Sequence, residues 1–387
     1  MKDVLIITSY YPPEIGAASN RIFHLGEGLK KHDCNVSVIT PLPNYPKGEI
    51  FSNYKGKFRQ ASEENGIKVY RLWVYASNSK NKLFRLIAML SYSFSLIWFF
   101  LWNTIPKTVI VQSPPLFVAF TCMLILKSKK RKLILNVSDL WPLAGLELGI
   151  FKKNLSYELL EKIERFNYKR AHLILGQSEE ILTHIVSCFP KKETFLYRNF
   201  PDFELPKAEY SSMSSTKIKV VYAGLLGVAQ GILKLCQNLD YTYIEFHIYG
   251  AGAEQNEISE FIINNPDLPI TYNGELPRKE LHIALLQYDI TIIPLLNSIY
   301  GSVPSKIFEY AKLGIPILYF AGGEGESMVK KYNLGWIVKV GNYDDLNNTL
   351  SVRTKSELNL KLRERIKEIA NANFNLKKQI EDFKKHL

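Results

Sequence analysis

Short apolar runs alternate along the chain with stretches whose apolar residues recur every three or four positions. The first run, residues 4–7, is followed by Ile22, Leu25 and Leu29 at helical spacing. The stretch 157–170 shows the clearest helical pattern. Strands that alternate with helices predict β-α-β units and a parallel sheet. Further runs of strand length lie at 36–40, 67–72, 109–112, 133–137 and 173–176.

This alternation stops over residues 199–216, which hold two prolines and a Ser-Ser-Met-Ser-Ser run, and we interpret this segment as an inter-domain linker. The pattern then starts again and ends in a charged helical stretch over 355–387. The sequence therefore predicts two doubly wound α/β domains that face a shared cleft, with ligands at the carboxyl ends of the strands. The predicted strands of the second domain are 218–222, 244–248, 270–272, 290–293 and 315–319.

Length and composition agree with this picture. The chain has 387 residues, of which 47% are hydrophobic and 22% charged, as in a globular protein of two domains. Its four cysteines form no C-x-x-C pair, which disfavours a zinc site or a redox motif. Their scatter fits a reducing compartment, and the opening residues do not resemble a secretory signal.

The basic excess lies in the first half of the chain. The net charge is +12, but residues 1–200 hold 28 Lys and Arg against 15 Asp and Glu, whereas residues 201–387 hold 21 against 22. Such an asymmetry indicates an anionic partner of the first half: nucleic acid, a membrane surface or phosphates. No nucleic-acid-binding module is present, so we do not expect nucleic acid to be that partner.

Residues 86–105 form an uncharged, aromatic-rich segment of 20 residues. Three interpretations are open: a buried core helix, a helix at a membrane surface, or a bilayer span. A span would put parts of one sheet on opposite sides of the membrane, and a basic cluster at 127–132 fits anionic lipid, so we favour the surface helix. The residues expected to face the membrane are Arg85, Phe94, Trp98, Phe99 and Trp102.

Two loops after predicted strands combine small residues with a following helix, which suits phosphate. One spans 10–21 and holds Gly16 and Arg21; the other spans 224–231 and holds Gly224 and Gln230. The first loop matches neither a dinucleotide fingerprint nor a Walker A loop, so an ordinary turn remains an alternative for it.

The segment 301–316 is the third candidate. Pro304 suits a first helical turn, and Ser305 and Lys306 lie where a diphosphate would meet free N–H groups and a cation. Glu309 lies on the same helix face and has two oxygens for the adjacent hydroxyls of a ribose. The alternative to a donor-binding role is that Lys306 and Glu309 form an ion pair on the helix surface. Asp139, after a strand of the first half, faces the cleft or caps a helix.

Six motifs occur in one order: PPEIGAASNR near the start, PNYPKG at 43–48, SPPL at 113–116, DLWP at 139–142, AQG at 229–231 and PSKIFEYAKLGIPIL at 304–318. Together they resemble family 4 glycosyltransferases of the GT-B fold, and most closely the bacterial O-antigen and capsule subgroup that includes N-acetylfucosamine transferases. The resemblance implies a nucleotide-sugar donor bound mainly by the second domain and retention of the anomeric configuration. It matches Glu309 to the ribose-binding second glutamate of E-x7-E, Lys306 to the lysine of PSK, and Gly16 to the glycine near the donor phosphates.

The sequence departs from the family pattern at several positions. Gly301 stands where the first glutamate of E-x7-E is expected, and Ser138 stands in place of a histidine. Leu225 and Gln230 occupy the positions of an Arg/Lys pair, and Val228 that of an arginine. Neutralisation of the donor phosphates is therefore expected from Lys306, helix N-termini and Arg21.

The sequence thus predicts a retaining transferase that moves a sugar, expected from a UDP-sugar, to a polyprenyl-diphosphate-linked saccharide of a bacterial surface polysaccharide. Lys306 would stabilise the leaving diphosphate and Asp139 would position the acceptor. Residues 1–200 and a C-terminal helix at about 361–387 are expected to form the acceptor and membrane-facing domain, and residues 201–360 the donor domain. We expect no metal and a place on the cytoplasmic face of the inner membrane. A nucleotide-sugar epimerase and a non-catalytic nucleotide-binding subunit are the alternatives; the sequence assigns no oligomeric state.

Overall fold

Two compact units make up the computed structural model of the chain. Unit 1 consists of Met1–Asn199, Ile299–Ser302 and Leu376–Leu387, and unit 2 of Phe200–Ser298 and Val303–Asn375. The structure describes residues 1–387 except 15, 78, 80, 151 and 208–215, and of residues 82, 83 and 85 it describes the backbone only. Residues 208–215 of the predicted linker therefore lie outside the described residues.

Unit 1 is built on an eight-stranded sheet of order β3-β4-β2-β1-β5-β6-β7-β8, in which β3 alone is antiparallel. The strands are β1 (Lys2–Ile7), β2 (Cys34–Pro41), β3 (Arg59–Glu64), β4 (Ile67–Leu72), β5 (Thr108–Ser113), β6 (Lys132–Val137), β7 (Leu173–Gly176) and β8 (Glu193–Leu196). The helices are α1 (Ala17–Lys31), α2 (Lys82–Trp102), α3 (Leu116–Ile125), α4 (Leu143–Glu147), α5 (Leu155–Arg170), α6 (Glu179–Cys188) and α14 (Leu376–Lys384).

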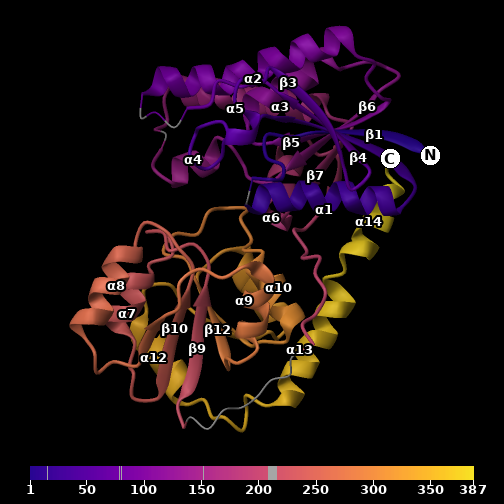
Figure 1. Cartoon of the computed structure of the whole chain (residues 1–387). Coiled ribbons are helices and arrows are strands. Elements are labelled where there is room, and N and C mark those ends of the chain that lie inside the picture. Colours follow the sequence, from indigo (N-terminus) through magenta and orange to yellow (C-terminus); the bar gives the residue numbers. More distant parts are fainter. Residues whose placement is uncertain (15, 78, 80, 151, 208–215) are drawn as a thin grey trace. The chain divides into compact units, whose positions relative to one another are not determined.

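Helices cover both faces of this sheet (Figure 1). One face packs against α2, α3, α5 and α6 in a single apolar core, to which Leu96, Ala119, Tyr168 and Ile181 contribute. The opposite face is covered by α1 and α14, which pack together so closely that a Cβ on Gly28 would lie 2.8 Å from Ile380.

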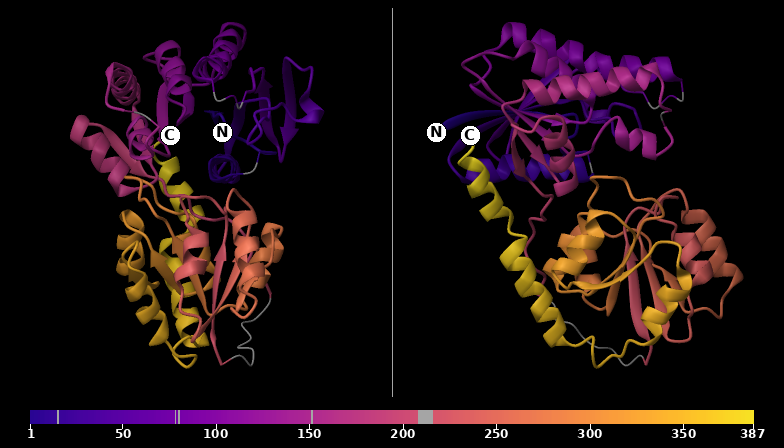
Figure 2. Two further views of the ribbon diagram at one scale, coloured as in Figure 1. Left: turned by 90° about the vertical axis from the view of Figure 1, so that its left-hand side faces the viewer. Right: turned by 180° about the vertical axis from the view of Figure 1, so that it is seen from behind.

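Unit 2 has an all-parallel six-stranded sheet of order β11-β10-β9-β12-β13-β14, and Figure 2 shows its layers from two further sides. The strands are β9 (Ile218–Ala223), β10 (Ile244–Tyr249), β11 (Ile270–Tyr272), β12 (Ile290–Pro294), β13 (Ile317–Phe320) and β14 (Gly335–Val338). The helices are α7 (Ile232–Asn238), α8 (Gln255–Asn264), α9 (Arg278–Leu285), α10 (Lys306–Leu313), α11 (Glu324–Lys331), α12 (Tyr343–Ser351) and α13 (Leu360–Asn373).

The predicted doubly wound α/β class is confirmed in both units. The strand order reverses between β1 and β5 in unit 1 and between β9 and β12 in unit 2. In open α/β sheets of this kind, ligands bind outside the carboxyl ends of the strands at such a reversal. Functional side chains are therefore expected in the segments that follow β1 and β9.

Three strands were absent from the sequence prediction: β3, β8 and β14. For β3 the sequence carried a usable signal, because Asn65 and Gly66 both adopt positive φ, 50° and 69°, as in a two-residue hairpin turn. β8 and β14 have only four residues each, and their apolar patterns are too short to stand out.

The C-terminal helical stretch is two helices that belong to different units. α13 lies in unit 2, where it packs along α10. α13 ends before Phe374, whose buried ring has its centre 5.0 Å from that of Phe308. α14 lies in unit 1 and buries Ile380 and Phe383 there. The share of unit 1 therefore begins at Leu376, later than the expected 361.

Candidate functional site

The loops that follow β9 and β10 approach each other without side chains between them. A Cβ on Gly250 would lie 1.8 Å from the carbonyl oxygen of Gly224, so that position accepts glycine only. A Cβ on Gly224, whose φ is +154°, would lie 1.7 Å from the Nζ of Lys306. The sequence-predicted residues Gly224 and Lys306 are thus in direct contact at the carboxyl end of β9.

Lys306 begins α10 and points back to the end of β9. Its Nζ donates to the carbonyl of Ala223, which also accepts from the hydroxyl of Tyr310 at 3.0 Å. The same Nζ lies 4.6 Å from the ring centre of Tyr222. Burial lowers the pKa of Lys306 to about 8, against a smaller opposing effect of Glu309. A cation with a perturbed pKa is therefore fixed beside a glycine loop.

Glu309 lies one turn further along α10 and binds two side chains of α9. Its Oε1 accepts from Nε2 of His282 at 2.6 Å and from Nε of Arg278 at 3.3 Å. Burial alone would raise the pKa of Glu309, but the His282 bond and the charges of Arg278 and Lys306 outweigh it and hold that pKa below its ordinary value. Glu309 is thus an ionised carboxylate in this site.

The other two predicted donor-binding residues of unit 2 take backbone roles here. Ser305 precedes α10 in helical conformation, and its carbonyl accepts from Phe308 and Glu309. Gln230 closes a turn by donating its N–H to Gly227 at 3.0 Å. The first N–H groups of α7 are not free for a phosphate, because Glu254 Oε2 accepts from Ile232 at 3.1 Å.

Gly301 stands in unit 1 and has a backbone that disfavours a glutamate. Its φ is +85°, and a Cβ there would lie 2.8 Å from Ile181. Its carbonyl accepts from Ser178 Oγ at 2.7 Å, and its N–H donates to Glu180 Oε2 at 2.6 Å. The missing first glutamate is therefore accompanied by a local conformation that favours glycine.

At the corresponding edge of unit 1, Asp139 follows β6. Burial raises its pKa to about 6, although the charge of Arg21 opposes this. Arg21 itself is 2% exposed and donates to Asn136 Oδ1 at 2.6 Å and to Gln177 Oε1 at 3.2 Å. The structure therefore couples Asp139 to Arg21, but it places Arg21 inside the unit, bonded to neutral amides.

A chain of polar side chains crosses the strand ends next to Asp139. Thr8 Oγ1 donates to Gln112 Oε1 at 2.6 Å, and Gln112 Nε2 donates to Ser138 Oγ at 3.3 Å. Thr8 and Ser138 directly follow β1 and β6, and Gln112 is the penultimate residue of β5, which lies between these strands in the sheet. Sequence reasoning missed Thr8, which follows an apolar run, and Gln112, which lies at the end of one.

Gly16 caps α1 in an extended conformation, and a Cβ there would only touch the ring of Tyr45 at 4.0 Å. The loop before it is tied to the loop after β2, because Glu14 Oε1 accepts from the N–H groups of Asn44 at 2.7 Å and Tyr45 at 2.9 Å. The bonds of Glu14 therefore fix the segment before α1 to the loop that follows β2.

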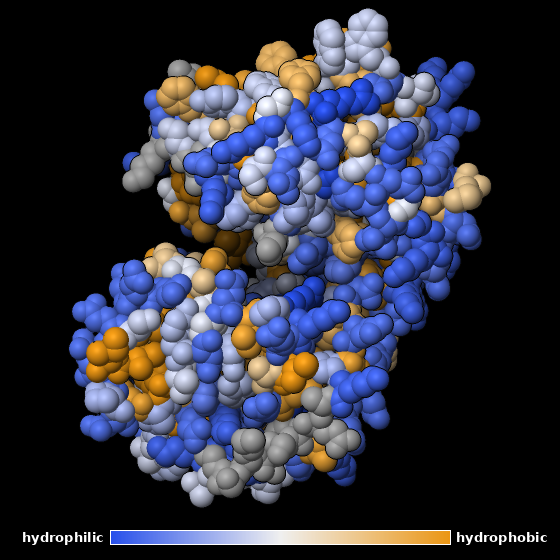
Figure 3. Space-filling view, viewed as in Figure 1, coloured by the Kyte–Doolittle hydropathy of each residue, from blue (hydrophilic) through white to orange (hydrophobic). Residues whose placement is uncertain are grey.

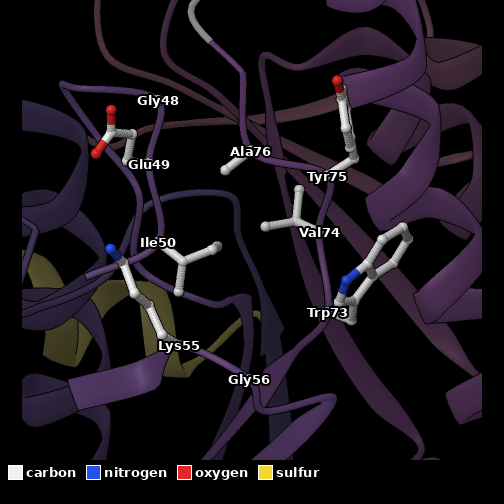
Figure 4. A pocket seen from close by; sticks show the side chains of 9 residues that line it. All are labelled: Gly48, Glu49, Ile50, Lys55, Gly56, Trp73, Val74, Tyr75 and Ala76. Carbon is white, nitrogen blue, oxygen red and sulfur yellow. The ribbon is translucent and has the colours of Figure 1, made fainter. Parts of the chain in front are cut away.

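An open pocket of about 400 Å³ lies beyond these loops, where β2 and β4 end (Figure 4). Ile50, Lys55 and Glu49 form one side of it, and Val74, Trp73 and Tyr75 the other. Phe58 stacks on Trp73 with ring centres 6.1 Å apart. The pocket combines an aromatic wall with one cation and one carboxylate, which suits a polar molecule with apolar faces.

α2 is apolar on both faces: it buries Tyr92, Leu96 and Phe99 in the core of unit 1 and exposes aromatic rings on its outer face. Phe94, Trp98 and Trp102 are 68%, 61% and 71% exposed, and Figure 3 shows apolar side chains along the part of unit 1 where α2 lies. The inner face buries three serines, at 91, 93 and 95. Ser91 Oγ accepts from Tyr75 N–H at 2.9 Å, and Ser95 Oγ donates to Trp73 carbonyl at 2.7 Å.

The expected outward orientation fails for Phe99 and is not described for Arg85. Phe99 is 5% exposed and packs in the core of unit 1, so its assignment to the outer face was wrong. The side chain of Arg85 lies outside the described residues.

In the part of the chain that the structure describes, no helix has the length and apolarity needed to cross a bilayer. Within the same residues, no group of three or more His, Cys, Asp or Glu side chains could hold a metal ion.

His282 and Arg278 are functional candidates that the sequence reasoning missed. Their spacing of four places them on one face of α9, but nothing in the sequence shows that this face meets Glu309. Such a contact between two helices depends on the tertiary fold.

Comparison with known proteins gives matches over nearly the whole chain. Residues 16–193 match the family model described as glycosyl transferase 4-like domain, and residues 212–372 match glycosyl transferases group 1. The putative colanic acid biosynthesis glycosyl transferase WcaI of Escherichia coli is 23% identical over 271 residues, which are 65% of this chain and 66% of that protein.

Solved structures agree in fold at low identity. The sucrose-phosphate synthase of Thermosynechococcus elongatus superposes with a TM-score of 0.76 at 13% identity, over 100% of this chain and 98% of that one. Anabaena Alr3699/HepE, solved in complex with UDP and glucose, gives a TM-score of 0.68 at 14% identity, over 100% and 99%.

Proposed function

The chain belongs to the group 1 glycosyltransferases of GT-B fold, and on this premise we propose that it transfers a sugar from a UDP-sugar to a polyprenyl-diphosphate-linked saccharide with retention of the anomeric configuration. The pathway we propose is the synthesis of a bacterial surface polysaccharide at the cytoplasmic face of the inner membrane. The description of WcaI as a colanic acid biosynthesis enzyme and the UDP bound by Alr3699/HepE support this choice of pathway and donor.

The observation that carries the donor assignment is the contact between Lys306 and the end of β9. Lys306 places a cation against Gly224, where a backbone without side chains admits a diphosphate. Glu309, ionised and one turn away, offers carboxylate oxygens to the ribose hydroxyls.

The proposed reaction is a displacement on one face of the donor sugar. The acceptor hydroxyl oxygen forms a bond to the anomeric carbon while the bond from that carbon to the diphosphate oxygen breaks. The proton of the hydroxyl passes to the leaving diphosphate, so UDP and the extended saccharide are the products. Lys306 stabilises the negative charge that develops on the diphosphate, and Asp139 orients the acceptor.

The acceptor assignment rests on unit 1. α2 exposes aromatic side chains on its outer face and buries serines on its inner face. An exposed aromatic face favours contact with an apolar partner, and we assign this role to a lipid surface. The net charge of +13 over residues 1–200 favours anionic lipid as that surface. The pocket beside Trp73 and Tyr75 would take the saccharide of the lipid-linked acceptor, because Ser91 and Ser95 tie its aromatic wall to α2.

The test is a binding and transfer assay with the full chain. Calorimetry with UDP, ADP, GDP and CDP is expected to show selective binding of UDP. Incubation of UDP-sugars with polyprenyl-diphosphate saccharides in vesicles is then expected to give an elongated lipid with retained configuration by NMR. Conversion of the UDP-sugar without an acceptor would favour an epimerase, and UDP binding without turnover a non-catalytic subunit.

A further inference from the structure

Among the residues that the structure describes, the carboxylate of Glu309 is held from one side only. Both of its bonds, from His282 and Arg278, are made by Oε1. The two donors lie four residues apart on α9 and approach from the same direction. With Oε1 occupied, the orientation of the carboxylate is fixed and Oε2 keeps its lone pairs for another donor.

His282 makes the shorter of the two bonds to Glu309, and its ring is itself oriented by neighbours. It is 3% exposed, and its ring centre lies 4.1 Å from that of Phe203. Phe203 is fixed in turn by Lys312, whose Nζ donates to the Phe203 carbonyl at 2.8 Å and lies 4.5 Å from the ring centre. Since an ionised carboxylate can only accept, Nε2 of His282 carries the proton in the 2.6 Å bond.

We propose that His282 is the positioning residue that makes Glu309 selective for the ribose diol of the donor. The inference rests on the proposed function, in which Glu309 binds the ribose. A free carboxylate samples several rotamers, and ordering it costs free energy on binding. The bond from His282 supplies that order beforehand, so the two ribose hydroxyls meet an acceptor already in place.

Discrimination between two nucleotides tests this role. Calorimetry on the full chain compares UDP with 2′,3′-dideoxy-UDP, which lacks both hydroxyls. The wild-type chain is expected to bind UDP at least about tenfold more tightly. His282→Phe keeps the contact with Phe203 but lacks the donor, and the ratio is expected to fall several-fold, because Glu309 is then oriented by the 3.3 Å bond from Arg278 without the bond from His282. His282→Gln keeps an N–H donor and is expected to restore most of the ratio.

Binding of dideoxy-UDP is expected to be unchanged in all variants, which separates positioning from general damage to the fold. His247→Phe is the matched control, because His247 lies 3.6 Å from Glu245 elsewhere in unit 2. If His282→Phe does not fold, His282→Asn, which is too short to reach Glu309, takes its place.

The outcomes separate the two levels of the proposal. A wild-type ratio in His282→Phe or His282→Asn, together with a lost ratio in Glu309→Ala, would overturn the role of His282 and leave the donor site intact. An unchanged ratio in Glu309→Ala, which has no acceptor for the hydroxyls, would instead overturn the ribose assignment, and with it the proposed donor site.

Discussion

The Nζ of Lys306 donates to the carbonyl of Ala223, the last residue of β9, and so fixes a half-buried cation to a strand end. The low pKa of Lys306, about 8, gives this contact a pH dependence. Affinity for UDP is expected to fall as pH rises through about 8, because the lysine loses its proton there. Calorimetry across pH 6.5 to 9.5 measures this slope.

Lys306→Met is expected to weaken UDP binding by about 1.5 to 3 kcal/mol, the range for a hydrogen bond to a charged group, and to abolish the pH slope. Exposed Lys330 of α11 is the control, and Lys330→Met is expected to leave both unchanged. A wild-type slope in Lys306→Met would show that another group titrates.

Asp139 is expected to limit the reaction on the acid side. Because burial raises its pKa to about 6, kcat/KM is expected to fall below pH 6 as the carboxylate is protonated. Asp139→Asn is expected to lower kcat/KM and to flatten this acid limb. A limb that persists in the variant would assign it to a different residue.

The same raised pKa affects stability with a definite sign. Between about pH 4 and 6 the folded state binds more protons at Asp139 than the unfolded state does, so stability is lost as pH rises through that range. Asp139→Asn is therefore expected to raise the melting temperature at pH 7 but not at pH 4. Calorimetric scans at the two pH values check this without any substrate.

The two faces of α2 give a matched pair of variants. Replacing Phe94, Trp98 and Trp102 with serine is expected to release the protein from anionic vesicles with little change in melting temperature, because these side chains are exposed. Phe99→Ala is expected to cost about 3 kcal/mol of stability, because that ring is buried. Equal vesicle co-sedimentation of the triple variant and the wild type would exclude α2 as the membrane surface.

Trp73→Ala tests the pocket of unit 1. Loss of the aromatic wall is expected to raise KM for the lipid-linked acceptor about tenfold and to leave the Kd for UDP unchanged. Steady-state kinetics with each substrate varied in turn distinguish the two effects. A change in Kd for UDP alone would contradict an acceptor role for this pocket.

Reintroducing the family glutamate at position 301 is not expected to improve activity. A side chain there must adopt the φ of +85° and clash with Ile181, which costs about 1 to 3 kcal/mol. Gly301→Glu is therefore expected to lower the melting temperature. A gain in kcat without loss of stability would show that the backbone adapts.

The elements with long periodic patterns could be predicted from the sequence, because burial of one face makes apolar residues recur at the spacing of a helix or a strand. β3 was missed although Asn65-Gly66 marked its hairpin. The outward placement of Phe99 was wrong because apolarity alone does not say which side of an almost wholly apolar helix faces the core. The pairing of His282 with Glu309 could not be predicted, since it joins two residues that are 27 positions apart and lie on different helices.

The division of the C-terminal helices has a consequence for synthesis on the ribosome. Ile380 and Phe383 of α14 complete the layer that covers the α1 face of the unit 1 sheet. A nascent chain carries the strands of that sheet long before residues 376–387 emerge. Until then part of an apolar layer stays open to chaperones or to other chains, and a fragment that stops at Asn199 keeps it open permanently. Unit 1 therefore cannot be cut out as one continuous piece, whereas the stretch 200–375 holds all of unit 2 together with four residues of unit 1.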